Sequence, residues 1–109
     1  MTKRPDRLLI LDIRNAAELI SQFIATADKV SFADNAMMVS AVAYQLQIIG
    51  EASGQLTQSF KDKYPTVPWT DIRGMRNILV HVYHGMDIDV LWTTAVVAVP
   101  QFLGLIVGD

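Results

Sequence analysis

The chain has 109 residues, of which 51% are hydrophobic and 18% are charged, so it is too apolar for a disordered tail and fits one domain spanning residues 1–109. It contains no cysteine, which excludes disulfides, thiolate zinc sites and cysteine nucleophiles. A net charge of −2 argues against a general nucleic-acid coat protein, although the stretch from Lys61 to His84 is locally basic.

The apolar fraction is high for so short a chain, because a small domain has a large surface to cover with polar groups. The excess has a natural place in a subunit interface, since obligate dimer contacts resemble a core cut in half. We therefore expect a homodimer or a higher homo-oligomer. The first residues lack both the apolar stretch and the cleavage site of a signal peptide, so we expect a cytoplasmic protein.

A first helix is predicted from about Pro5 to Ala27. Its apolar residues recur at three- and four-residue spacing and should form one buried stripe, made of Leu9, Ile13, Ala16, Ala17, Ile20 and Ile24.

A second helix is predicted from about Asn35 to Lys63, after a connection that ends at Asp34, which can cap it. Its apolar residues again follow helical spacing, at Val39, Val42, Leu46, Ile49 and Leu56. Gly50 and Gly54 each cost about 1 kcal/mol relative to alanine inside a helix. Either glycine could instead permit a close approach of another helix.

Two prolines three residues apart mark a break, and a third helix should run from Pro68 or Trp69 to about Tyr83, with Pro68 at a first helical position. After a short turn at His84, Asp87 can cap a fourth helix, which Pro100 should kink or split.

The segment from Val90 to Gly108 carries no charge, which raises the alternative of a membrane span. Threonines, a glutamine and a central proline interrupt it, and no basic flank marks a cytoplasmic end. We therefore expect no membrane association, and a helix that is buried in the core and in a dimer contact.

The third helix carries Arg76, Asn77, His81 and Tyr83 within eight positions. From spacing alone, these residues could simply close the end of a helix. In an ideal helix Arg76 and Tyr83 share a face, Asn77 lies one turn below His81, and Arg76 and His81 diverge by roughly 140°. A long arginine side chain, a frayed last turn or a two-fold partner could each bring the guanidinium and the imidazole together.

The run from Pro68 to His81 resembles the hallmark of HepT-like HEPN proteins. The segments Ile48–Ala52, Lys63–Pro65 and Ile88–Trp92 also match the pattern of that family in order and spacing. The resemblance implies an all-α, four- to five-helix up-and-down HEPN bundle. Val82 and the very apolar C-terminal tail depart from the usual pattern.

The resemblance also implies an activity, that of a toxin endoribonuclease which cleaves transfer RNA or messenger RNA and is paired with a nucleotidyltransferase antitoxin. Matched by position, Arg76 and His81 would be catalytic, Asn77 would support them, and Tyr83 would receive AMP from the antitoxin. The alternative is a non-catalytic helical dimer that binds and regulates a nucleotidyltransferase partner.

These residue types suit RNA cleavage without a cofactor. An imidazole can move protons near neutral pH, and a guanidinium offers several donors to phosphate oxygens. We expect no metal, because His81 and His84 have no nearby set of carboxylates with metal-ligand spacing. His84 is interpreted as a turn residue. Glu51, if partly buried, could pair with Arg73 or Arg76.

Two tryptophans could stack on bases, but core packing is the simpler interpretation for both Trp69 and Trp92.

Overall fold

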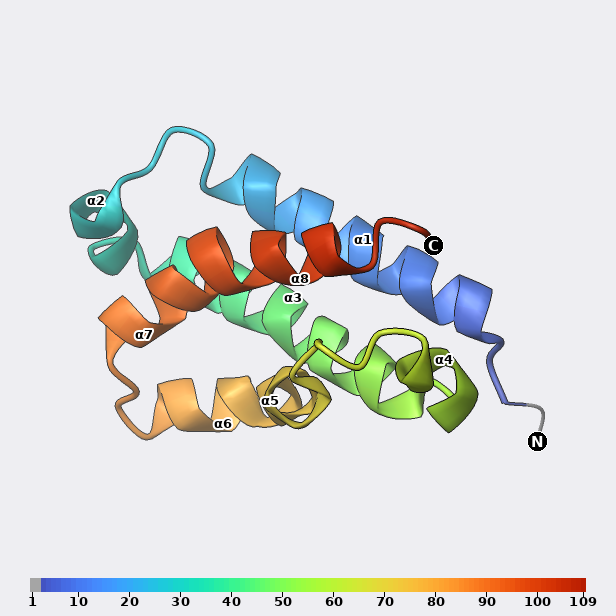
Figure 1. The fold of residues 1–109 in the computed structure, drawn as a ribbon. Coiled ribbons are helices and arrows are strands. Elements are labelled where there is room, and N and C mark those ends of the chain that lie inside the picture. The colour runs from blue at the N-terminus through green and yellow to red at the C-terminus, as the bar shows by residue number, and fades with distance from the viewer. Residues whose placement is uncertain (1–2) are drawn as a thin grey trace.

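The computed structural model describes residues 3–109, and every regular element within that range is a helix. The long helical runs lie side by side and alternate in direction (Figure 1). They are α1 (Asp6–Phe23), α3 (Ala36–Gln55), the pair α5 (Trp69–Gly74) and α6 (Ile78–Tyr83), and the pair α7 (Ile88–Thr93) and α8 (Val99–Leu105). The predicted all-α, up-and-down bundle is confirmed.

The apolar stripes predicted for the first two long helices form the core. In α1, five of the six predicted residues are buried and Ile24 packs against the core from just beyond the helix end. All five apolar residues predicted for the second helix are buried, although Leu56 lies just after α3. The three- and four-residue spacing of apolar residues thus correctly predicted which residues of these helices are buried.

The predicted connection before α3 contains a short helix, α2 (Lys29–Ala33). Asp28 and Ser31 form a reciprocal capping box at its start, with the Ser31 N–H donating to Asp28 Oδ1 at 2.8 Å. The cap predicted for the next helix at Asp34 is wrong. Asn35 holds that position, because its Oδ1 accepts a hydrogen bond of 3.0 Å from the Met38 N–H.

The second predicted helix is too long, since α3 ends at Gln55 and α4 (Gln58–Asp62) follows as a separate short helix. Thr57 causes the break by capping α4 through its hydroxyl oxygen. The Asp6 carboxylate accepts from both the Thr57 N–H, at 3.0 Å, and its hydroxyl, at 2.6 Å. These two bonds join the first turn of α1 to α4.

The fourth predicted helix begins as expected, with Asp87 capping α7 by accepting from the Asp89 N–H at 2.8 Å. Between α7 and α8 the chain takes one π-helical segment, η2 (Thr94–Ala98). Pro100 lies in the first turn of α8, directly after η2. Pro100 cannot donate a backbone hydrogen bond, and the wider turns of η2 lie just before it. The chain stays helical from Ile88 to Leu105, so the expected split at Pro100 is wrong and the irregularity precedes the proline.

The stretch Ile88–Leu105 is long and apolar enough to cross a membrane by length and composition alone. In the folded chain one face of it enters the core through Leu91, Ala95, Val99 and Phe102. Val90 and Val97 on the same stretch are exposed. The predicted burial of this stretch in the core is confirmed. The predicted dimer contact stays a prediction.

The last residues fold back onto the start of the bundle. The Arg14 guanidinium donates to the backbone oxygens of Ile106, at 3.0 Å, and Asp109, at 3.2 Å. The Asp109 carboxylate accepts from the Tyr64 hydroxyl and pairs with Lys63. That hydrogen bond raises the pKa of Tyr64 and lowers the pKa of Asp109.

Candidate active site

The predicted third helix is interrupted where the motif begins. A single 3-10 turn, η1 (Met75–Asn77), separates α5 from α6, and Pro68 precedes the first helical residue instead of occupying it. A 3-10 turn has three residues per turn, so Met75 and Ile78 point the same way. Both are buried, and this burial leaves Arg76 and Asn77 exposed.

The backbone of Arg76 lies directly against α3. A Cβ added at Gly50 would come within 2.2 Å of the Arg76 backbone nitrogen and 2.7 Å of the Met75 carbonyl carbon. No side chain fits in that space, so only glycine allows the two helical runs to approach so closely. The predicted role of a glycine in close helix approach is confirmed for Gly50. At Gly54 the nearest neighbour is the flexible side chain of Arg73, at 3.3 Å.

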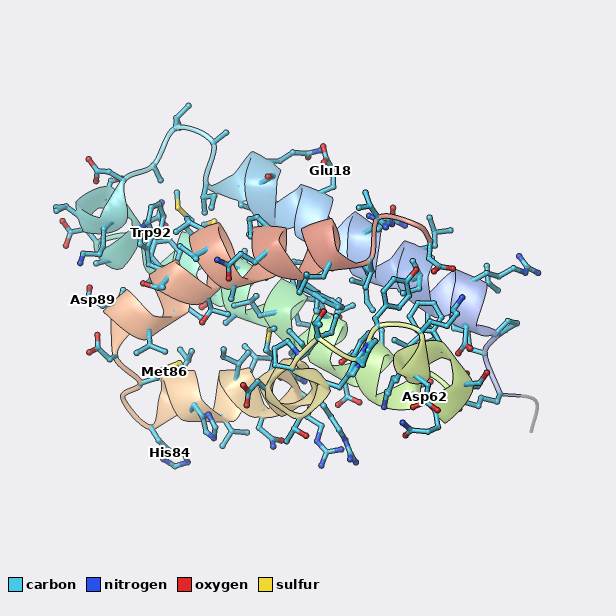
Figure 2. All side chains as sticks on the ribbon, in the orientation of Figure 1. Glu18, Asp62, His84, Met86, Asp89 and Trp92 are labelled. Atoms are coloured by element: carbon cyan, nitrogen blue, oxygen red, sulfur yellow. The ribbon has the colours of Figure 1, made fainter. Side chains whose placement is uncertain are left out.

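The turn after α6 is hydrogen-bonded to the backbone of His81. The His81 backbone oxygen accepts from the Met86 N–H at 2.9 Å and from the His84 N–H at 3.2 Å. Gly85 has a φ of 83°, a left-handed conformation that favours glycine and turns the chain. His84 follows α6 in this turn, as predicted, and points away from the bundle (Figure 2). The His81 side chain is exposed.

His81 lies on the edge of a groove with a volume of about 350 Å³. One wall comes from α5, η1 and α6 and the other from η2 and α8. Met86 lies just beyond the end of α6 (Figure 2). Its apolar lining includes Ile72, Met75, Ile78, Met86, Phe102 and Leu105. Its polar lining consists of Asp71, His81, Thr94 and Gln101.

The single chain brings only part of the predicted constellation together. With about 120° per residue through η1 and 100° in α6, Asn77 and His81 lie on one side of the helix axis and Arg76 on the other. Of these residues, His81 lines the groove, and neither Arg76 nor Asn77 does. The tightened turn thus widens the divergence expected from an ideal helix.

Two further predictions concern neighbouring side chains. The Tyr83 side chain lies outside the described part of the structure, although its backbone belongs to α6. Glu51 is exposed, so the condition for its suggested pairing with Arg73 or Arg76 is not met, and the ion pairs found within residues 3–109 do not include it. No group of three or more potential metal-ligating side chains occurs in the same range.

Both tryptophans pack as predicted. Trp69 stacks edge-on against Phe102, with ring centroids 5.6 Å apart, and its indole N–H donates to the Tyr64 backbone oxygen at 3.1 Å. Trp92 lies 5.1 Å from Phe32 at the other end of the bundle. Each ring is therefore a core anchor in the folded chain.

Sequence comparison identifies relatives along nearly the whole chain. Residues 13–106 match the family described as Ribonuclease HepT-like. A candidate RNase of Methanocaldococcus jannaschii is 39% identical over 101 residues, which cover 93% of each chain. A candidate ribonuclease HepT of Thermococcus cleftensis is 36% identical over 102 residues, 94% of this chain and 93% of its own. No solved structure matches the chain.

The fold is therefore an all-α bundle, and the sequence match associates it with ribonucleases. The chain belongs to the HepT-like ribonuclease family, as its resemblance to HEPN proteins indicated.

Two features near the motif could not be established from the sequence alone. The groove residues Asp71 and Gln101 are separated by about one quarter of the chain, and their proximity depends on how α5 packs against α8. The need for glycine at position 50 was visible only as an open alternative, because its partner is backbone and leaves no side-chain signal.

Proposed function

We propose that the chain is a toxin endoribonuclease that cleaves RNA without a metal, using Arg76 and His81. The main support is that both side chains are exposed on one short segment, with His81 lining a groove, within a family of ribonucleases. An exposed arginine and histidine can reach a large polyanionic substrate, whereas a buried pair could not. Asn77, on the same side of the axis as His81, supports the imidazole.

The proposed chemistry uses the ribose 2′-hydroxyl of the substrate as nucleophile. The His81 imidazole removes its proton, the 2′-oxygen bonds to phosphorus, and the bond from phosphorus to the 5′-oxygen breaks. The departing oxygen takes up a proton from an imidazolium or from water. The guanidinium of Arg76 donates to the phosphorane oxygens, where negative charge increases. The products are a 2′,3′-cyclic phosphate end and a 5′-hydroxyl end.

A homodimer would complete the site. Since the geometry of η1 and α6 puts Arg76 and His81 on opposite sides of the helix axis, a two-fold axis beside α6 would place the arginine of one copy opposite the histidine of the other. The exposed apolar face of α7 and α8 supplies surface for such a contact. A closed two-fold pair would therefore present two composite sites in one cleft.

Regulation would follow from modification of Tyr83 by a nucleotidyltransferase antitoxin. An attached AMP adds bulk and negative charge two residues from His81, which should repel RNA phosphates. Mass spectrometry of the chain after co-expression with a neighbouring nucleotidyltransferase should find AMP-sized additions on Tyr83. Additions found only on other residues would contradict this part of the proposal.

The cleavage proposal is tested with purified protein and a mixed RNA substrate in the presence of a chelator. We expect His81→Ala and Arg76→Ala each to lower the cleavage rate by at least about 100-fold. His84→Ala is the matched control, because this histidine points away from the bundle and should leave the rate unchanged (Figure 2). Full activity of His81→Ala would overturn the assignment.

The alternative of a non-catalytic dimer that regulates a nucleotidyltransferase makes the opposite prediction in cells. A nuclease toxin should arrest growth on expression, and Arg76→Ala should relieve the arrest. A purely binding protein would cause no arrest that depends on Arg76.

A further inference from the structure

The groove beside His81 has the composition of a small-ligand site. Its volume of about 350 Å³ falls within the usual range of about 300–1,000 Å³ for ligand pockets. The floor and walls are mainly apolar, and the carboxylate of Asp71 and the amide of Gln101 come from opposite walls, on α5 and α8. A mainly apolar groove whose lining includes a carboxylate residue and an amide residue suits an aromatic ring that carries hydrogen-bonding edges.

We propose that this groove binds a nucleobase of the RNA next to the scissile phosphate, and that Asp71 makes guanine the preferred base. The inference rests on the proposed ribonuclease function for its biological meaning. His81 lies on the edge of the groove, so a phosphate held there would place an adjoining base within reach of the groove. Enzymes that recognise unpaired RNA bind splayed bases in this manner.

The charges fix the orientation of the nucleotide. The Asp71 carboxylate would repel a phosphate, so the phosphate belongs on the His81 side and the base belongs inside. A carboxylate has two acceptor oxygens, and guanine is the standard base that presents two adjacent donors, N1–H and the N2 amino group, on one edge. The Gln101 amide can donate to an acceptor on the base from the facing wall.

A second copy of the chain is the competing occupant of an apolar groove. It would have to bury Asp71, which has no cationic partner among the ion pairs found within residues 3–109. Burying an unpaired carboxylate against an apolar surface is costly. The unpaired carboxylate of Asp71 therefore favours a nucleobase over a second copy of the chain as the occupant of the groove. The experiment below distinguishes these two occupants.

Methyl NMR with isotope-labelled methionine gives a readout independent of cleavage. Met75 and Met86 line the groove, whereas Met37 and Met38 lie beside a different hollow next to Phe23. Guanosine 3′-monophosphate added to the full chain should shift the signals of Met75 and Met86 and leave those of Met37 and Met38 in place. Cytidine 3′-monophosphate should need roughly tenfold more nucleotide for the same shift.

Asp71→Asn should remove the preference for guanine, since an amide offers only one acceptor. Asp34→Asn, at the end of α2 and outside the groove lining, is the control and should keep the preference. Equal shifts for both nucleotides, or no shift at Met75 and Met86, would overturn the proposal. Groove signals that change on dilution of the protein but not on addition of nucleotide would identify a second copy as the occupant.

The binding result and the cleavage result can fail separately. If guanosine 3′-monophosphate binds the groove but RNA stays intact, the base site stands and the ribonuclease proposal falls. If RNA is cut but the groove does not respond to nucleotide, the base site falls alone. Sequencing of cleaved ends should then show no change in the neighbouring base between the parent and Asp71→Asn.

Discussion

At the scale of single residues, Gly50 has the most demanding environment near the motif. A Cβ there would lie 2.2 Å from the backbone nitrogen of Arg76, so Gly50→Ala must push η1 away from α3. We expect a folded but less stable protein, by about 1–3 kcal/mol, because overpacking in a close contact is costly. RNA cleavage should fall further than stability explains, since the displaced segment carries the arginine.

The measurements are urea unfolding and the cleavage rate well below the unfolding transition. Gly104→Ala is the matched control, because an added Cβ at position 104 meets no atom within 4 Å. Alanine should there increase stability slightly through its helix propensity. A Gly50→Ala protein with parental activity would show that the close contact does not position Arg76.

The sequence motif proposes the residues of the candidate site, but it could not predict where their side chains lie relative to one another. The motif identified Arg76 and His81, and both prove exposed. Their orientation depends on η1, which forms because Met75 and Ile78 are both drawn into the core. That choice is made by packing against α3, and tertiary packing overrides local helical preference.

At the scale of helices, the link between α1 and α4 should make stability depend on pH. Partial burial raises the pKa of Asp6, but hydrogen bonds from the Thr57 hydroxyl and N–H, aided by Lys3 and Lys63, outweigh it and lower the pKa overall. A carboxyl whose pKa is lower in the folded chain stabilises the fold above its unfolded value, about 3.9. This stabilisation is lost as the pH falls through the folded value.

The midpoint of urea unfolding should therefore drop as the pH is lowered below about 4, and Asp6→Asn should make that drop shallower. Asp34→Asn should retain the parental pH profile. The low pKa values of Asp28 and Asp109 leave part of the dependence in every variant. An unchanged profile for Asp6→Asn would show that its hydrogen bonds to Thr57 are too weak to matter.

The spacing of apolar residues predicted the buried faces of the helices better than it predicted where the helices end. Apolar spacing predicted the buried faces of α1 and α3, since burial and helical pitch act together along a regular stretch. It missed the end of α3, because Leu56 keeps the helical spacing while its backbone is extended. The cap at Thr57 and its bonds to Asp6 decide that break, and the second partner is 51 positions away.

At the scale of the whole molecule, a composite site predicts complementation between inactive variants. When Arg76→Ala and His81→Ala proteins are mixed and allowed to exchange subunits, half of the dimers should be mixed, and each should hold one intact arginine–histidine pair. Activity should recover to about one quarter of the parental value for random exchange. Recovery should be absent if both residues act within one copy. The cleavage rate before and after exchange measures the difference.

The exposed apolar face of the last helices should be part of the dimer contact. Val97 is 45% exposed on η2, and Val97→Lys should place a charge there and shift the protein toward monomer. Light scattering after size exclusion measures the mass. Ser59→Lys, on an exposed position of α4, is the control for added charge alone. A parental mass for Val97→Lys would place the contact elsewhere.

The two tryptophans lie in different environments, so their fluorescence reports on different parts of the molecule. Trp69 touches Phe102, a groove residue, while Trp92 reports on the opposite end through Phe32. Because the sequence holds only these two indoles, replacing Trp92 with phenylalanine leaves Trp69 as the single indole, in contact with a residue that lines the groove. Its emission intensity and wavelength would then follow filling of the groove in real time, so the kinetics of nucleotide entry become accessible without any attached dye.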